Sequence, residues 1–286
     1  MAAPKPPPPK RKFDLINRGD KSSTPLGTLT FLGLRALDLP LQHTLLSPSG
    51  LGLTLLSRAG LAAALPAGTQ LLHTGLPLVD ALGHPQSLLL FAMAAGSAAK
   101  QAYWLTVLSA ESFPASAAFA VSALNSFWNG LNAVLFLALA TSSLESRPLV
   151  SVPLPAVLGV PGNSLLVPLS AVVGTAMYVG GLTLETVAEQ QRKAFKAAPE
   201  NAGKVCKVGA WRWARHINYF GYALWRGGYA MAATGWVGGL AMTAFLVYDL
   251  SARAAAVLDD YCTNKYKEQW FQFKREVPYT IIPGVY

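Results

Sequence analysis

Three long stretches without a charged side chain limit most strongly what this chain can fold into. No Asp, Glu, Lys or Arg occurs at 112–144, 148–184 or 227–248. A helix that crosses a bilayer needs about 20 mostly apolar residues, so each stretch can supply one. Only 13% of the 286 residues are charged, against about 25% in soluble domains. A large soluble helical core is the alternative, and it is disfavoured because soluble helices need a polar face.

The apolar pattern predicts an all-α, polytopic membrane bundle with about six transmembrane helices. Residues 29–41 mix apolar side chains with Arg35 and Asp38, so we expect a short interfacial helix there. The last apolar stretch forms either a hairpin broken near Thr234 and Gly235 or one long tilted helix. The Pro, Gly and Ser content of 145–161 predicts a loop. The expected spans before that hairpin are 43–65, 85–108, 114–142 and 165–185.

The charge distribution predicts which parts of the chain lie in the cytosol. The net charge is +9, and basic residues concentrate near the N-terminus, at 192–215 and near the C-terminus. Such clusters beside apolar spans follow the positive-inside rule and bind anionic lipids, so we expect membrane lipids rather than nucleic acid as partners. Cys206 and Cys262 lie in these basic parts and are expected to be thiols, and no metal-ligand spacing is present. Three regions are expected: a disordered Pro-rich tail (1–28), N-terminal transmembrane helices (29–164) and a C-terminal domain (165–286).

A basic and aromatic segment at 209–221 carries most of the chemistry that the sequence offers. Arg212 and Arg215 flank Trp213, and Arg192 and Lys196 share a helix face. Guanidinium groups bind phosphate and stack on aromatic rings. These residues predict either a site for a phosphate-bearing ligand or a loop that binds lipid headgroups at the interface.

The order of residues in this region adds a resemblance to a known family. Trp211, Arg215, His216, Asn218 and Tyr219, followed by Tyr266 and the segment 277–286, resemble the C-terminal domain of the steroid 5α-reductase and sterol reductase superfamily. The resemblance implies an integral membrane protein of the endoplasmic reticulum, and the charge distribution predicts that both termini are cytosolic. It implies NADPH-dependent reduction of a carbon–carbon double bond in a lipophilic substrate drawn from the bilayer. The cofactor-binding residues it implies are Arg192, Lys196, Trp211, Arg215, His216, Asn218, Tyr219, Cys262 and Tyr266.

Departures from the family pattern keep two other functions open. Ile217 replaces a Pro, Tyr222 replaces a Glu, and Val257 and Leu258 replace an Arg-Asp pair. Isoprenylcysteine and phospholipid methyltransferases share this fold and use S-adenosylmethionine in an equivalent place. The alternatives are therefore a lipid or prenyl-type methyltransferase and an inactive membrane protein.

Catalytic candidates on the substrate side come from the second expected span. Lys100 is an ionisable residue inside an apolar segment, and Tyr103 lies three residues further on the same face. Tyr103 could donate a proton, with Lys100 lowering its pKa; alternatively, Lys100 extends to the membrane edge. Asn125, Asn129 and Asn132 form one polar stripe that either lines a cavity or bonds neighbouring helices.

Overall fold

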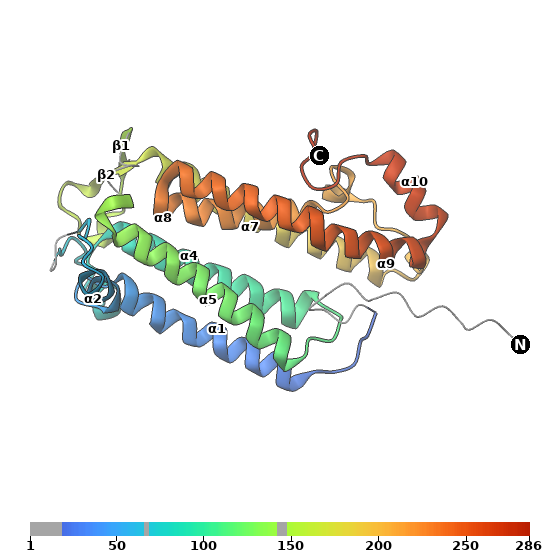
Figure 1. Ribbon diagram of the computed structural model, residues 1–286, viewed down its shortest axis with the longest axis horizontal. Helices are drawn as coiled ribbons and strands as arrows, with labels where there is room; N and C mark the ends of the chain where they lie inside the picture. The colour runs from blue at the N-terminus through green and yellow to red at the C-terminus, as the bar shows by residue number, and fades with distance from the viewer. Residues whose placement is uncertain (1–18, 66–68, 142–147) are drawn as a thin grey trace, which may run out of the picture.

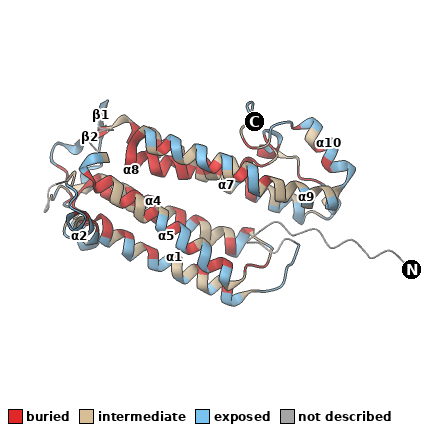
Figure 2. Ribbon diagram, in the orientation of Figure 1, coloured by how far each residue is buried: buried red, intermediate tan, exposed pale blue. Residues whose placement is uncertain are grey.

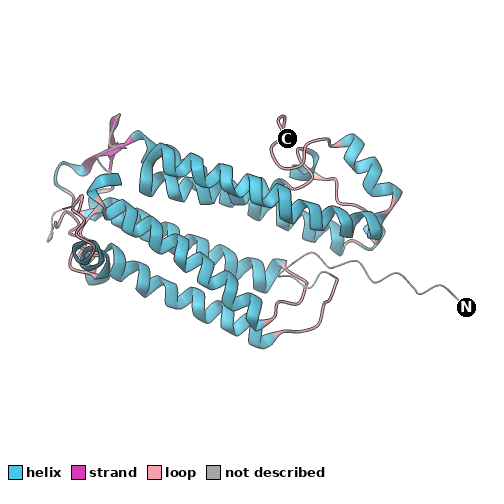
Figure 3. Cartoon of the chain, viewed as in Figure 1, coloured by secondary structure: helices cyan, strands magenta, loops and turns pink. Residues whose placement is uncertain are grey.

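The computed structural model describes residues 19–65, 69–141 and 148–286, and these are mostly helical (Figure 3). Five long helices run side by side along the molecule (Figure 1). They are α1 (Pro25–Leu46), α4 (Pro85–Tyr103), α5 (Ala115–Leu137), α7 (Leu169–Ala197) and α8 (Ile217–Asp249). A π-helical turn, Trp104–Leu108, extends α4.

Shorter elements close the two ends of this bundle (Figure 1). The helices α2 (Leu51–Arg58) and α3 (Pro77–Asp80) lie at one end with the antiparallel strands β1 (Leu149–Pro153) and β2 (Ser164–Pro168), which pair Leu149 with Pro168. At the other end, the π-helical turn Leu250–Ala255 leads from α8 into α9 (Ala256–Tyr266), and α10 (Glu268–Glu276) follows. Single 3₁₀ turns occupy Ala156–Leu158, Pro161–Asn163, Pro199–Asn201 and Gly209–Arg212.

The helix α8 is a hairpin that reverses at Gly235. That glycine has φ 78° and ψ −165°, a conformation outside the helical region that side chains disfavour. The two arms then pack closely, since a Cβ on Gly227 would lie 1.8 Å from Thr243 Oγ1 and one on Gly239 would lie 2.3 Å from Met231 Cβ. Of the two forms that the sequence allowed, the hairpin broken at Thr234 and Gly235 is confirmed.

Backbone-to-backbone contact joins α7 to the first arm of α8. Gly174 faces Gly228, and Gly181 faces Gly221 one heptad away on each helix. A Cβ on Gly174 would lie 2.6 Å from the Gly228 carbonyl oxygen, and one on Gly181 would lie 2.7 Å from that of Gly221. Glycine lets the helices approach until their backbones touch, as expected for small residues in apolar bundles.

Two expectations about the N-terminal half are wrong. Residues 43–65 do not form one span, because α1 ends at Leu46 and α2 begins at Leu51, with Pro48 and Gly50 between them. Arg35 and Asp38, both on α1, are buried in the bundle instead of lying at an interface. They pair with each other, and Asp38 also accepts a hydrogen bond from Asn129 of α5. The helix α1 also begins at Pro25, inside the expected tail, whose first 18 residues lie outside the described part.

The loop expected at 145–161 is also only partly right. Its residues 145–147 are outside the described part, and 149–153 form β1, which pairs with β2. This strand is short and ends at Pro153, so its own residues do not predict a strand. Its pairing with residues 164–168 forms the sheet.

Two helices in the described residues are both long and apolar enough to cross a membrane, Leu169–Ala197 and the stretch Ile217–Tyr266 that reverses at Gly235. The outer faces of the bundle carry many exposed large apolar side chains, and Figure 2 shows buried residues gathered where the helices meet. These outer residues include Phe119, Leu124 and Phe127 on α5, Val179 on α7, and Val237, Leu240 and Phe245 on α8. The six-span topology itself stays a prediction.

Candidate functional site

The basic and aromatic segment packs where the end of α7 meets the start of α8. Trp211 is buried, and its indole nitrogen donates to the Ala188 carbonyl of α7 at 2.8 Å. The Ala210 amide donates to Gln191 Oε1 at 2.8 Å. These two hydrogen bonds hold the 3₁₀ turn Gly209–Arg212 against α7, so this part of the segment is packed on the helix.

Glu189 is the centre of this arrangement. Its side chain is buried, and it accepts hydrogen bonds from Asn218 Nδ2 at 2.9 Å and from Arg192 Nη2 at 2.5 Å. The Arg192 guanidinium also lies over the Trp211 ring, 5.4 Å from its centroid. Three of the residues implied by the resemblance, Arg192, Trp211 and Asn218, are therefore brought together around a carboxylate that the sequence reasoning did not single out.

Arg212, Arg215 and Lys196 are bonded to the protein itself, and Arg212 Nε donates to the Lys207 carbonyl oxygen at 3.4 Å. The Arg215 guanidinium donates to the carbonyls of Val277 and Pro278 at 2.7 and 2.8 Å, and to Thr280 Oγ1 at 2.9 Å. Lys196 donates to the Lys204 carbonyl and to Tyr266 Oη, the latter at 3.1 Å. The backbone amides of Arg215 and His216 also donate to the carbonyl oxygens of Tyr279 and Thr280. The start of α8 is therefore bonded to the C-terminal segment through both side chain and backbone.

An aromatic pair lies beside this tie. The rings of His216 and Tyr219 stack with centroids 5.2 Å apart and an interplanar angle of 14°, and Trp270 of α10 lies 6.4 Å from His216. Cys262 and Tyr266 pack at the edge of a separate apolar cluster that contains Trp270 and Phe273. The nine residues implied by the resemblance therefore divide into a group around Glu189 and a group around the C-terminal segment.

The two cysteines are thiols. Burial raises the pKa of the Cys206 thiol, so this side chain stays protonated and packs as a small apolar group. Among the described residues, no cluster of three His, Cys, Asp or Glu side chains could hold a metal ion.

Lys100 and Tyr103 both turn toward α7, but each has its own partner there. The buried Lys100 ammonium forms an ion pair with Glu185 Oε1, and the Trp225 indole donates to Glu185 Oε2 at 2.7 Å. Gln190 Nε2 donates to the Tyr103 hydroxyl at 3.0 Å. The ion pair keeps the Lys100 charge inside the bundle instead of at its edge, and the catalytic role of both residues stays a prediction.

The asparagine stripe bonds neighbouring helices. Asn129 Nδ2 donates to Asp38 Oδ2 at 2.9 Å, and Asn129 Oδ1 accepts from Arg226 NH1 at 3.1 Å. Asn125 Oδ1 accepts from Arg226 and from Gln101. For these two asparagines, the helix-bonding alternative is confirmed.

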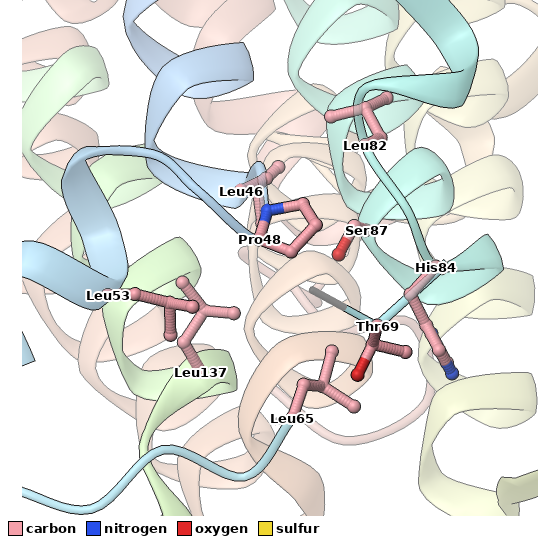
Figure 4. Close-up of a pocket in the computed structure, with 9 residues that line it drawn as sticks. All are labelled: Leu46, Pro48, Leu53, Leu65, Thr69, Leu82, His84, Ser87 and Leu137. Carbon is pink, nitrogen blue, oxygen red and sulfur yellow. The ribbon is translucent and has the colours of Figure 1, made fainter. Parts of the chain in front are cut away.

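A small enclosed cavity at the opposite end of the bundle is too small to bind a cofactor. Figure 4 shows its apolar walls, formed by residues that include Leu46, Leu53 and Leu137, with Ser87 and His84 at one side. Its volume is about 10 Å³, close to the least that holds one water molecule. Burial lowers the pKa of His84 to about 4, so its imidazole is neutral near pH 7.

The fold and the site together define a class of protein: a helical bundle with apolar outer faces and a basic, aromatic segment closing one end. A family described as "Protein of unknown function (DUF1295)" matches residues 130–277. The chain belongs to this family. It is also 34% identical over 253 residues to a protein of Ustilaginoidea virens named "Probable O-methyltransferase ustE", an alignment that covers 88% of this chain and 84% of that relative.

Sequence reasoning missed Glu185 and Glu189, although a signal for them was present. The two residues are four apart on α7, so they share a helix face, and that face meets α8. Two carboxylates at one turn's spacing beside an apolar helix need partners for the same reason as the arginines did.

Proposed function

We propose that this protein is a membrane-embedded O-methyltransferase that uses S-adenosylmethionine and acts on a lipophilic acceptor. Two findings support the proposal: the name of the 34% identical relative, and the buried carboxylate at the centre of the site. Neither the relative nor the family description supports the NADPH-dependent reductase that the resemblance implied. NADPH binding therefore stays a prediction of the resemblance alone.

The buried charge at the centre of the site favours S-adenosylmethionine over a dinucleotide. NADPH carries three phosphates, and the buried charged side chain here is a carboxylate, which repels phosphate. S-adenosylmethionine carries no phosphate. It has a cationic sulfonium, an ammonium and two ribose hydroxyls, which a carboxylate binds, and one carboxylate, which an arginine such as Arg192 binds. The buried Glu189 with its Asn218 and Arg192 partners is the observation that carries the proposal.

The residues present fit such a ligand. Glu189 would accept hydrogen bonds from hydroxyl or ammonium groups of the ligand. The Asn218 amide would both donate and accept hydrogen bonds, and Trp211 would present an apolar surface. When bound, S-adenosylmethionine supplies an electrophilic methyl group, which an acceptor oxygen takes as the carbon–sulfur bond breaks. The protein must then receive the hydroxyl proton of the acceptor.

Glu185 is the acceptor that we propose for that proton. It lies one helical turn from Glu189 on α7, toward the apolar bundle from which a lipophilic acceptor would arrive. Lys100 and Trp225 hold its two carboxylate oxygens in place. We infer that Glu185 accepts the hydroxyl proton, that Lys100 orients it, and that Tyr103 lies at the edge of this acceptor side.

Ligand binding to the purified full-length protein tests the proposal. Thermal unfolding in detergent is compared with S-adenosylmethionine, its demethylated product, NADPH and NADH. A ligand at 100 times its Kd stabilises the folded state by about 2.7 kcal/mol. We expect stabilisation by S-adenosylmethionine and by its product. Stabilisation by NADPH alone would overturn the proposal and restore the reductase.

A matched pair of variants tests the role of Glu189. Glu189→Gln keeps the size of the side chain and removes its charge, and Glu200→Gln makes the same change at an exposed position on a nearby turn. A hydrogen bond to a charged group contributes roughly 1.5–3 kcal/mol, so we expect S-adenosylmethionine to bind about tenfold or more weakly to Glu189→Gln. Equal affinities in the two variants would remove Glu189 from the site.

A further inference from the structure

The basic and aromatic segment has an outer face that the proposed methyl-transfer site does not use. Its 3₁₀ turn, Gly209–Arg212, buries Trp211 against α7, whereas Arg212 and the next residue, Trp213, are exposed. The Trp213 side chain is 57% exposed, although tryptophan is on average a highly buried residue. Trp211 and Trp213 therefore belong to different surfaces of the same short segment, and the outer surface needs an explanation of its own.

The Arg212 guanidinium presents donors on this outer face. Its Nε donates to the Lys207 carbonyl oxygen at 3.4 Å, whereas its two terminal nitrogens have no hydrogen-bond or ion-pair partner among the residues that the structure describes. The Lys207 ammonium itself is paired with Glu276 at 2.7 Å. Because a guanidinium binds phosphate through two parallel N–H groups, Arg212 offers an anion-binding group to the surroundings of the protein.

The length of α8 indicates the depth at which this face lies in a membrane. At about 1.5 Å per residue, the first arm from Ile217 to the bend at Gly235 is about 27 Å long, and the hydrocarbon core of a bilayer is about 30 Å thick. The bend lies at one end of the bundle and the start of α8 at the other (Figure 1). In a bundle that crosses the membrane, Arg212 and Trp213, which come just before the start of α8, therefore lie at the level of the lipid headgroups.

We propose that Arg212 and Trp213 bind an anionic phospholipid, with its phosphate at the Arg212 guanidinium and the Trp213 ring among the headgroups. Tryptophan is enriched at this level of a bilayer, and basic side chains are attracted to the anionic lipids of the cytoplasmic leaflet. A free phosphate would bind Arg212 alone and leave the Trp213 ring in water, so the pair fits a lipid better. The proposal rests on the membrane location given under the proposed function, and it does not depend on the methyl donor.

Thermal unfolding of the full-length protein in lipid nanodiscs tests the proposal. Discs of phosphatidylcholine are compared with discs of phosphatidylcholine and phosphatidylglycerol, and a third sample adds the soluble headgroup glycerophosphoglycerol to phosphatidylcholine discs. A ligand that binds the folded state raises its stability, so we expect a higher unfolding midpoint only in the discs that contain phosphatidylglycerol. Equal midpoints in the two kinds of disc would overturn the proposal. The same rise with the soluble headgroup would also overturn it, because the surface would then bind free phosphate.

The design separates this proposal from the proposed function. No sample contains S-adenosylmethionine, so the result does not depend on the methyl-donor site. Size-exclusion chromatography first shows whether the protein enters the discs. A protein that enters the discs but does not respond to phosphatidylglycerol would overturn only the lipid surface, whereas a protein that stays outside the discs would overturn the membrane location as well.

A matched pair of variants locates the surface. Arg212→Gln removes one exposed positive charge from the segment, and Arg58→Gln removes one from an exposed position of α2, at the opposite end of the bundle (Figure 1). Both variants change the net charge of the protein equally. We expect Arg212→Gln to lose most of the rise in unfolding midpoint that phosphatidylglycerol causes, and Arg58→Gln to keep it. Equal rises in the two variants would overturn the role of Arg212.

Quenching by brominated lipid tests the position of Trp213. The fluorescence that the protein loses in Trp213→Phe is the contribution of Trp213. This contribution is compared in discs of phosphatidylcholine that carries bromine either near the headgroup or near the end of the acyl chain. We expect stronger quenching by bromine near the headgroup. Stronger quenching by bromine near the chain end, or no quenching by either lipid, would overturn the placement of Trp213 among the headgroups.

Discussion

At the scale of single residues, the structure depends on pairing charges that the apolar bundle buries. Lys100 pairs with Glu185, Arg192 with Glu189, and Arg35 with Asp38. Each pair contains at least one buried charge that would be costly if it were isolated. The pairs that include Glu185 and Glu189 position side chains of the candidate cofactor site. The pair on α1 allows charged residues to be buried between the helices.

Asp38 should be among the most sensitive residues of the bundle. Its carboxylate accepts from Arg35, Gln42 and Asn129, so Asp38→Ala leaves the buried Arg35 guanidinium without its anion. Removing one partner of a buried pair costs about 3–5 kcal/mol. We expect a large fall in the thermal unfolding midpoint in detergent.

Asp249→Ala is the control for that prediction. Asp249 forms a partly exposed ion pair with Arg253 four residues later, and such pairs contribute about 0–1 kcal/mol. The two unfolding midpoints should differ clearly. If both variants lowered the unfolding midpoint by a similar small amount, the hydrogen bonds of Asp38 would not stabilise the bundle.

At the scale of secondary-structure elements, the contact between α7 and α8 positions the candidate site. The glycine pairs bring the helix backbones together, and this close approach lets Glu185 reach Trp225 and lets Glu189 reach Asn218. The hairpin at Gly235 then returns the chain, so that α9 and α10 lie beside the start of α8 (Figure 1).

Gly181→Ala should separate α7 from α8. Its Cβ would meet backbone atoms of α8, 2.5 Å from the Trp225 amide nitrogen and 2.7 Å from the Gly221 carbonyl oxygen. Overpacking of this kind costs about 1–3 kcal/mol, so we expect a lower unfolding midpoint and weaker binding of S-adenosylmethionine.

Gly180→Ala provides the matched control, because no atom lies within 4 Å of the added Cβ. Alanine in a helix is more favourable than glycine by up to about 1 kcal/mol, so this variant should be neutral or slightly more stable. Destabilisation of both variants to the same extent would contradict the packing argument.

At the scale of the whole molecule, the apolar residues cover the outside while the polar residues are paired within. Val237, Leu240 and Phe245 are exposed on α8, whereas Arg35, Asn129 and Arg226 are buried. A water-soluble protein seldom exposes so many large apolar side chains together. This distribution supports the proposed location of the bundle in a membrane.

Membrane fractionation tests that location. We expect the full-length protein to sediment with membranes and to stay there after washing with alkaline carbonate, because apolar helices in the bilayer are not released when surface charges are screened or changed. Extraction should require detergent. Release of folded protein by carbonate would show instead that the apolar faces attach only peripherally or cover one another in an oligomer.

The sequence by itself determined the helical class, several helix boundaries and the place of the candidate site. Apolar composition and spacing are local properties, so they predicted α4, α5, α7 and the break at Gly235. The polar and aromatic residues that lie close together from Trp211 to Tyr219 indicated the position of the candidate site. They did not determine the ligand, because Arg192, Lys196, Arg212 and Arg215 looked available for phosphate.

Only the tertiary structure decided which charges pair. Glu189 lies 29 residues from Asn218, and Asp38 lies 91 from Asn129. Such pairs depend on how the helices pack against one another, and the spacing of residues along one helix does not predict this packing. The same limit explains the wrong expectation of an interfacial helix at 29–41: Arg35 and Asp38 looked too polar for a buried helix, and their burial depends on their pairing with each other and with Asn129 of α5.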